Sequence, residues 1–253
     1  MTMTRTAETT LPALALTERH ALVTGGTRGL GRAVALALAG LGAHVTACYR
    51  SDEEAADALR ADLAALPGDH LVLRADVTTE DGARAVADAC RARSATLHVL
   101  VNTVGTMERA PLAAPGDAVL RRALATNLDA AFLVSREVRP LLTDGSSVVN
   151  VGSGAARRGL PGHAAYTASK AGLAGLTRSL AKEWGGAGIR VNLVDPGILG
   201  GAALPPAQAD HLRGLTSLGR LGTPAEVAGV IAFLAGDLAG YVTGATLTAD
   251  GGI

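Results

Sequence analysis

Residues 20–31 read His-Ala-Leu-Val-Thr-Gly-Gly-Thr-Arg-Gly-Leu-Gly, an apolar run that passes through a glycine-rich loop into a helix-like segment from Arg32. Glycines between a first strand and a first helix keep the turn tight and let the backbone approach a pyrophosphate at the helix N-terminus. The spacing of Gly25, Gly29 and Gly31 differs from G-x-G-x-x-G, so the loop alone also fits a structural turn. Its place between strand and helix favours a dinucleotide site.

Apolar strand-like runs alternate with helix-like segments along the chain. We expect strands at residues 20–24, 44–48, 70–74, 97–101, 147–151, 189–194 and 245–249. We expect helices near residues 30–41, 52–66, 79–93, 117–142, 164–185 and 224–234. Buried strands separated by helices predict an α/β class: a single-domain, Rossmann-like, doubly wound parallel sheet of about seven strands with helices on both faces. The domain is expected at residues 17–253, after a flexible N-terminal arm at residues 1–16, with residues 197–220 irregular.

The composition narrows the class of protein. Lys+Arg and Asp+Glu are balanced at 23 each, and no basic stripe argues for nucleic acid or a membrane surface as a partner. No apolar stretch resembles a secretory signal or is long enough to span a bilayer. Cys48 and Cys90, the only cysteines, lie in apolar runs typical of buried thiols rather than of a disulfide or metal site. We expect a cytoplasmic protein without a metal.

Tyr166 and Lys170 are four residues apart in a segment expected to be helical, and Ser153 precedes them. Side chains at i and i+4 lie on one face of a helix. A lysine ammonium beside a phenol lowers the tyrosine pKa from its ordinary value of about 10, so that the phenol exchanges protons near neutral pH. The pair alone is a weak pattern that also fits an ordinary amphipathic helix.

Other candidate residues fall where strands are expected to end. Thr24, Asn102, Ser153 and Pro196 lie at or just beyond such ends. Ligands of doubly wound sheets bind at the carboxyl ends of the strands, so these residues are expected to meet in one site. Asp76 and Val77 follow the third expected strand, where they either line the adenine end or, in the case of Asp76 or Thr78, cap the next helix.

Tyr49, Arg50 and Ser51, at the end of the second expected strand, bear on the choice of dinucleotide. A free ribose 2′-hydroxyl is usually held by an acidic residue near Tyr49, and none is there. Arg50 follows instead, and Arg28 lies in the glycine loop. Because guanidinium groups bind phosphate oxygens through a planar fork, the two arginines favour NADP(H) over NAD(H), although both also fit solvated positions.

With these residues assembled, the chain resembles the short-chain dehydrogenase/reductase family along nearly its full length, most closely the 3-oxoacyl-[acyl-carrier-protein] reductases and related ketoreductases. The matching pieces are residues 24–31, 102–105, Asn127, Ser153, Tyr166-x-x-x-Lys170, Asn192-x-x-Asp195-Pro196-Gly197, 218–220, 223–228 and 250–252. Any one of these motifs can arise by chance, whereas the ordered set is specific.

The resemblance implies a catalytic tetrad. Tyr166 would protonate the carbonyl oxygen as hydride arrives from the nicotinamide, and Ser153 would polarise that carbonyl. Lys170 would lower the tyrosine pKa and hold the nicotinamide ribose, and Asn127 would hold a water that returns protons through Lys170. Residues expected to contact the cofactor are Gly25, Thr27, Arg28, Gly29, Leu30, Gly31, Tyr49, Arg50, Ser51, Asp76, Val77, Asn102, Gly105, Tyr166, Lys170, Pro196, Gly197 and Ile198. Residues 198–216 would form a substrate lid.

Three features depart from the family pattern. The usual Asn-Asn-Ala-Gly reads Asn102-Thr103-Val104-Gly105, with a bulkier Val104 beside the cofactor. A threonine usual near Gly201, which contacts the nicotinamide carboxamide, is missing. The lid is also short, and together these changes suggest looser nicotinamide anchoring or a more open pocket. His163 is expected to be non-catalytic, because Tyr166 already has its own activating partner.

The expected function is NADPH-dependent reduction of a ketone or 3-oxoacyl thioester to a secondary alcohol. If a carrier protein presents an acyl substrate, it needs a basic patch, for which the candidates are Arg121, Arg122, Arg157 and Arg158. Such arginine pairs are more often solvated faces or salt bridges between subunits. Two alternatives stay open: a non-redox scaffold that keeps the cofactor structurally, such as a cyclase, dehydratase or assembly module, and an NAD-dependent alcohol dehydrogenase. The resemblance also implies a homotetramer.

Overall fold

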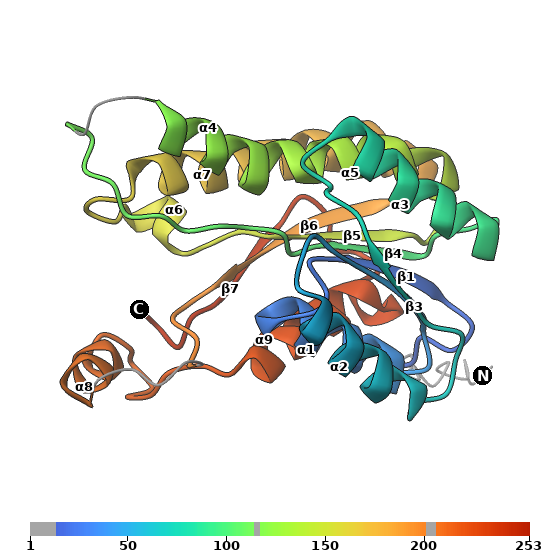
Figure 1. Cartoon of the computed structure of the whole chain (residues 1–253), viewed down its shortest axis with the longest axis horizontal. Coiled ribbons are helices and arrows are strands. Elements are labelled where there is room, and N and C mark those ends of the chain that lie inside the picture. Colours follow the sequence, from blue (N-terminus) through green and yellow to red (C-terminus); the bar gives the residue numbers. More distant parts are fainter. Residues whose placement is uncertain (1–13, 114–116, 201–205) are drawn as a thin grey trace, which may run out of the picture.

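A seven-stranded parallel sheet runs through the centre of the computed structural model, which describes residues 14–113, 117–200 and 206–253 (Figure 1). The strand order is β3-β2-β1-β4-β5-β6-β7, so the direction of winding reverses between β1 and β4. The strands are β1 (His20–Thr24), β2 (His44–Tyr49), β3 (Leu71–Arg74), β4 (Val99–Asn102), β5 (Ser147–Val151), β6 (Arg190–Pro196) and β7 (Thr246–Ala249). The predicted α/β class is confirmed, and the bounds of β1 and β5 match the prediction.

Helices cover both faces of this sheet, as Figure 1 shows. One face carries α1 (Gly29–Gly40), α2 (Glu53–Ala64) and α9 (Pro224–Ala235), and α1 packs along α9. The other carries α3 (Glu80–Arg93), α4 (Ala118–Leu124), α5 (Ala130–Val138) and α7 (Ala164–Trp184). Each layer of helices encloses an apolar core made mostly of Ala, Val and Leu. The central strands β1, β4 and β5 are buried along their whole length, so the middle of the sheet is shielded from water on both sides.

The helix predicted at residues 117–142 is interrupted in the structure. Between α4 and α5 the chain makes a π-helical turn at Ala125–Asp129, and a 3-10 turn at Arg139–Leu141 follows α5. The π turn carries the buried Asn127, whose side chain bonds to groups outside the helix. Such turns commonly mark functional positions, because the extra residue redirects a side chain.

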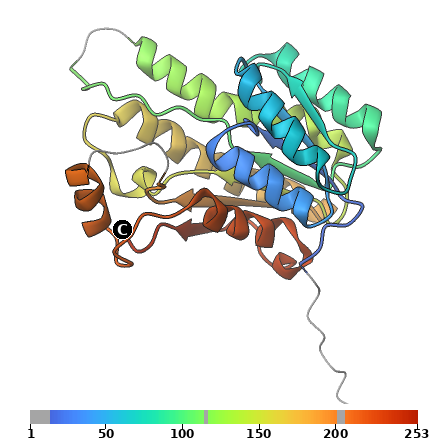
Figure 2. The same ribbon diagram turned by 60° about the horizontal axis from the view of Figure 1, so that its bottom comes forward.

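Two short helices in the second half were not predicted. One is α6 (Ala155–Arg158), just after β5, and the other is α8 (Pro206–Gly214), within the stretch expected to be irregular. The chain after α8 joins the C-terminus: Leu218 N donates to Gly251 O at 3.1 Å, and Ser217 Oγ to Gly252 O at 2.8 Å. Both views accordingly place α8 beside the C-terminus (Figure 2). Gly201, the site of the missing threonine, lies outside the described residues.

The start of the described chain corrects the predicted arm. Leu16 is fully buried in the core with α1, and its backbone N–H donates to Leu41 O at 2.8 Å. Residues 1–13 of that arm lie outside the described part. Cys48 and Cys90 are buried free thiols, and burial raises the pKa of each to about 12.

Neither membrane-spanning helices nor metal-binding clusters occur within the described ranges. Every helix there is too short or too polar to cross a bilayer. No three His, Cys, Asp or Glu side chains of these residues come together as metal ligands.

Four histidines line the amino-terminal edge of the sheet: His20, His44, His70 and His98. The Nδ1 atoms of His44, His70 and His98 each accept a hydrogen bond from a backbone N–H, at 2.8, 3.1 and 3.0 Å. Burial lowers the pKa of His20 to about 4, and it also lowers the pKa of His70 and of His98. A ring nitrogen that accepts such a bond cannot carry a proton without breaking it.

We therefore expect the fold to be acid-sensitive. The pKa of His20, His70 and His98 is lower in the folded protein than the unfolded value of 6.5, so the stabilising contribution of these three histidines is complete above pH 6.5 and is lost as the pH falls toward 4. The free energy of unfolding from urea titrations should fall between those pH values. In the variant His20→Gln it should fall less than in the control His211→Gln, which changes an exposed histidine on α8. Equal falls in the two variants would contradict the account.

Candidate active site

The carboxyl ends of the central strands open onto two adjoining cavities. The larger, of about 490 Å³, lies over the glycine loop and the ends of β2, β3 and β4. The smaller, of about 230 Å³, lies over the ends of β5 and β6. Gly105 and Thr106 line both, so the two spaces meet beside the loop after β4. An elongated ligand therefore has a continuous path from the edge of β2 to the end of β6.

The glycine loop has the shape that a bound phosphate requires. Gly25 has a positive φ of 65°, and a Cβ at Gly31 would overlap the Gly25 carbonyl oxygen. Gly29, which begins α1 and has a φ of 51°, faces open space, since no heavy atom lies within 4 Å of the point that a Cβ would occupy. No side chain caps α1, because Arg28 makes no capping hydrogen bond. The free N–H groups of the first turn thus face the larger cavity, which suits an anion.

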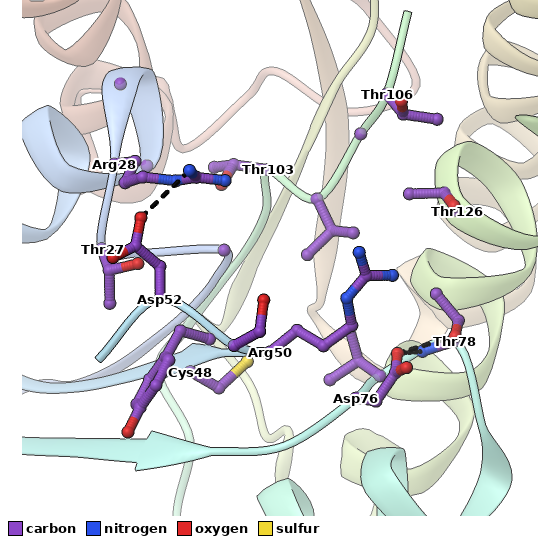
Figure 3. Close-up of a pocket in the computed structure, with 18 of the residues that line it drawn as sticks. Thr27, Arg28, Cys48, Arg50, Asp52, Asp76, Thr78, Thr103, Thr106 and Thr126 are labelled. Carbon is purple, nitrogen blue, oxygen red and sulfur yellow. Dashed lines mark hydrogen bonds and ion pairs between the residues drawn. The ribbon is translucent and has the colours of Figure 1, made fainter. Parts of the chain in front are cut away.

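Two arginines and an aspartate lie at the far side of this cavity: Arg28 in the glycine loop, and Arg50 and Asp52 after β2. Arg28 Nη1 pairs with Asp52 Oδ2 at 3.0 Å, and Figure 3 shows the two side chains pointing toward one another. Arg50 is exposed and reaches across the cavity from β2 toward Asp76 (Figure 3). Tyr49 lines the cavity, and its hydroxyl donates to Glu53 Oε2 at 2.6 Å. Of the two arginines, Arg28 is thus already engaged by a carboxylate, which the sequence pattern did not indicate.

Asp76 and Val77 line the larger cavity. Asp76 Oδ1 accepts hydrogen bonds from Thr78 N at 3.1 Å and from Thr78 Oγ1 at 2.7 Å, so the carboxylate closes a local turn. Those hydrogen bonds and the charge of Arg50 lower the pKa of Asp76 against the opposing effect of burial. The helix cap is Thr79, whose Oγ1 accepts from Gly82 N at 3.1 Å. The alternative that Asp76 or Thr78 caps α3 was therefore wrong, by three positions for Asp76 and by one for Thr78.

Asn102 lies behind the cavity rather than in its wall. Its Nδ2 donates to Asn150 Oδ1 at 2.9 Å and reaches Ser135 Oγ at 3.4 Å, which ties β4 to β5 and α5. The wall is made instead by the residues that follow it, from Thr103 to Thr106. Thr103 holds this loop against β1, since its N–H donates to Thr24 Oγ1 at 3.2 Å. The expected cofactor contact of Asn102 is thus replaced by a structural role, because its side chain turns into the sheet.

Ser153, Tyr166 and Lys170 come together in the smaller cavity with Pro196 and Gly197. Lys170 is 4% exposed, and its Nζ donates to the Val151 carbonyl oxygen at 2.7 Å. Burial lowers the pKa of Lys170 to about 8, an effect that the charge of Asp195 opposes. A buried ammonium at the floor of an otherwise neutral cavity is expensive to maintain and is typical of functional sites.

The pKa of Tyr166 differs in direction from the sequence prediction. Burial raises it above its ordinary value of 10, the Ser153 hydroxyl lowers it in part, and the charge of Asp195 raises it further. The prediction that Lys170 lowers it is not met in this structure, because the ammonium donates to the Val151 carbonyl oxygen beneath the cavity. Tyr166 is therefore a protonated phenol at neutral pH, which is the form that a proton donor needs.

Asn127 lies beneath the loop after β4 with its side chain fully engaged. Its Oδ1 accepts from Thr106 N at 2.7 Å, while its Nδ2 donates to Thr106 O at 3.0 Å and to Ser169 Oγ at 2.8 Å. Both amide hydrogens are used, so the side chain anchors the loop that joins the two cavities. The water-holding role expected for Asn127 finds no free side-chain donor.

Most of the predicted cofactor residues line the cavities. Ile198 does not, and neither does Asn102. His163, at the start of α7, places Nδ1 3.0 Å from Pro161 O, outside both cavities. Val104, expected beside the cofactor, does line the larger cavity, whereas the lining residues that the sequence prediction missed are Cys48, Asp52, Ala75, Thr78, Thr103, Thr106, Met107, Arg122, Thr126, Val151 and Gly152. Most of them are direct neighbours of predicted residues along the chain, and that adjacency is the signal that could have found them.

Comparison with known proteins agrees with this architecture. A family model described as "Enoyl-(Acyl carrier protein) reductase" matches residues 25–253. D-threitol dehydrogenase of Mycolicibacterium smegmatis is 39% identical over 92% of this chain and 91% of its own length. A 3-oxoacyl-[acyl-carrier-protein] reductase of Synechocystis sp. is 36% identical over 94% of this chain and 98% of its own.

Solved structures of other proteins are also similar to this chain over nearly its whole length. A dehydrogenase/reductase from Sinorhizobium meliloti superposes with a TM-score of 0.90 at 36% identity, covering 94% of this chain and 96% of that one. A short-chain dehydrogenase from Burkholderia cenocepacia, in complex with NADP, gives 0.89 at 33% identity, covering 94% and 98%. The fold, the joined cavities and these likenesses agree: the chain belongs to the short-chain dehydrogenase/reductase family.

Proposed function

We propose that the protein is an NADPH-dependent ketoreductase. The observation that carries this proposal is the meeting of Ser153, Tyr166 and Lys170 in a cavity that adjoins a phosphate-compatible glycine loop. Relatives named 3-oxoacyl-[acyl-carrier-protein] reductase are 36% and 38% identical to this chain, and a neighbour of 33% identity was solved with NADP. These likenesses support an oxidoreductase that acts on a carbonyl or alcohol carbon.

The residues fit NADPH along the two joined cavities. The N-terminus of α1 and the glycine loop would hold the pyrophosphate, and Arg50 would bind the 2′-phosphate through its guanidinium fork. Lys170 would hold the ribose nearest the reacting end. NADPH, when bound, supplies the hydride that reaches the carbonyl carbon.

Proton transfer is the task of the chain itself. Tyr166 donates its hydroxyl proton to the carbonyl oxygen, which becomes the alcohol oxygen, and the phenolate left behind is stabilised by the Lys170 ammonium. Ser153 donates a hydrogen bond to the same oxygen and so stabilises the negative charge that develops on it. The small cavity is lined by Gly105, Gly152 and Gly197, which leaves space above these groups for a ketone.

Each of the four arginines considered for carrier docking faces a carboxylate of this chain. Arg121 pairs with Asp117 at 2.6 Å, and Arg122 with Glu108 at 2.9 Å. Arg157 and Arg158 pair with Asp195 and Asp250, each at 3.4 Å. Since each cation already faces a carboxylate, the substrate that we propose is a free small ketone rather than a carrier-bound acyl chain.

Two observations bear on the assembly and on the rival reaction. Leu120 and Phe132, on α4 and α5, are 43% and 50% exposed, and we propose that other copies of the chain cover them in the homotetramer that the resemblance implies. The 39% identical relative named D-threitol dehydrogenase favours a second candidate, oxidation of a polyol hydroxyl to a ketone. The same residues would serve that direction at alkaline pH, where Tyr166 ionises to the phenolate that accepts the alcohol proton.

The reductase proposal predicts a specific loss in the variant Tyr166→Phe. Purified protein should oxidise NADPH in the presence of short β-keto thioesters or cyclic ketones, and Tyr166→Phe should lose about 10²-fold or more in kcat because the proton donor is gone. The control is Tyr241→Phe, a fully exposed tyrosine, which should keep wild-type rates. Ketone reduction that survives Tyr166→Phe would exclude Tyr166 as the acid. Turnover of polyols alone would favour the second candidate.

The cofactor preference should depend on Arg50. In Arg50→Ser the KM for NADPH should rise about tenfold or more, because a charge-assisted contact to the 2′-phosphate is lost, while the KM for NADH stays nearly unchanged. The matched control is Arg84→Ser, which removes an exposed arginine on α3 paired with Asp81. If Arg50→Ser weakened both cofactors equally, the arginine would not select the phosphate.

A further inference from the structure

A buried carboxylate lies directly beneath the candidate catalytic residues. Asp195, near the end of β6, is 1% exposed, and its Oδ1 accepts a hydrogen bond from the backbone N–H of Ser153 at 2.8 Å. A charged group in such a place is costly to bury unless it is paired, so its position calls for a compensating arrangement. The catalytic scheme above makes no use of it.

Gly152, which has no side chain, leaves the space that the Asp195 carboxylate occupies. A Cβ on Gly152 would overlap Asp195 Oδ1, so a larger residue at 152 would displace the carboxylate from beneath Ser153. The backbone of Gly152 also joins β6, since its N–H donates to Val194 O at 2.8 Å. The glycine before Ser153 and the aspartate on the next strand are thus sterically matched.

A cation on α6 faces the other carboxylate oxygen. Arg157 Nε lies 3.4 Å from Asp195 Oδ2, and Arg157 Nη2 donates to Thr248 Oγ1 at 2.8 Å on β7. The hydroxyl of Ser153 accepts from Ala155 N at 3.2 Å, at the start of the same helix. Ser153 is therefore fixed from two sides, by Asp195 through its backbone and by α6 through its side chain.

The charge of Asp195 acts on both reacting groups of α7. The negative charge of Asp195 raises the pKa of Tyr166, in the same direction as burial. The same charge also acts to raise the pKa of Lys170, where it opposes the larger lowering effect of burial. The other charged or titratable groups nearby are Arg157 and Arg158 on α6, Asp250 after β7, and His163 at the start of α7. Arg158 is occupied by Asp250 and the Ile253 carbonyl oxygen.

We propose that Asp195 is a positioning residue of this site, which holds Ser153 in place and keeps a negative charge beneath Tyr166 and Lys170. Gly152 makes room for it and Arg157 is its counter-ion. The expected effect of Asp195 on catalysis rests on the proposed reductase function, whereas its effect on the position of Ser153 rests on the geometry alone. Two consequences are separable: the hydrogen bond orients Ser153, and the charge holds protons on Tyr166 and Lys170 to higher pH.

Two substitutions separate these effects. Asp195→Asn keeps an acceptor for the Ser153 N–H but removes the charge, so the alkaline limb of the pH profile for ketone reduction should shift to lower pH with a modest change in kcat. Asp195→Ala also removes the acceptor, so it should shift the limb and lower kcat about tenfold or more, because Ser153 is misplaced. The control Asp81→Asn, on the exposed surface of α3, should leave the profile unchanged.

A titration decides the charge effect without turnover. Tyrosine ionisation followed by ultraviolet absorbance, with Tyr166→Phe as the reference in each background, should place the Tyr166 transition at lower pH in Asp195→Asn than in wild type. If wild-type protein reduces no ketone, the proposed function fails while this titration still decides the inference. An unmoved Tyr166 transition in a folded Asp195→Asn variant would overturn it.

A double-mutant cycle tests the steric match and guards against misfolding. Gly152→Ala alone should lower the melting temperature, whereas Gly152→Ala in the Asp195→Ser background should lower it less, because the overlapping oxygen is gone and only the contacts to Leu193 at 3.0 and 3.1 Å remain. Equal destabilisation by Gly152→Ala in both backgrounds would show that the two residues are not coupled.

Discussion

The reversal of strand order between β1 and β4 is the constraint on which the rest of the structure depends. The chain winds one way to β3 and the other way to β7, so the loops that leave β1 and β4 part and open a crevice at the carboxyl edge. Hydrogen bonds between Thr103 and Thr24 fix the two sides of that crevice at their base. The glycine loop can then fold tightly on one side, while Gly105 and Thr106 lead to the second cavity on the other.

Within this frame, buried charge distinguishes the reacting end from the rest of the crevice. Lys170 and Asp195 are both almost fully buried, on α7 and β6, and each is held by a backbone group of the chain around Ser153. Burial disfavours the ammonium, and the carboxylate favours it, so the two charges depend on one another. Small residues such as Gly152 make this arrangement fit. The loss of stability that the site causes is offset by the apolar layers on both faces of the sheet.

Much of this was predictable from the sequence, for identifiable reasons. The apolar runs at β1 and β5 have sharp ends, and the glycine loop and the Tyr166–Lys170 spacing are local patterns, so their positions were correct. Three details of the site depend on contacts between distant segments: the Asn102 side chain turns toward Asn150, Arg28 pairs with Asp52, and Lys170 Nζ donates to Val151 O. Asp195 lies beneath Ser153 only because β5 and β6 are neighbours in the sheet. Neither the periodicity of the sequence nor the spacing of its motifs predicts such a contact.

The most direct test of the central claim is transfer of deuterium from NADPH that carries deuterium at both positions of the nicotinamide C4. The reduced ketone should carry deuterium on its carbinol carbon when wild-type protein is used, and none should appear beyond background with Tyr166→Phe. Product formed from labelled NADPH without deuterium at that carbon, or labelled product formed equally by the Phe variant, would contradict the assignment of this crevice as a reductase site.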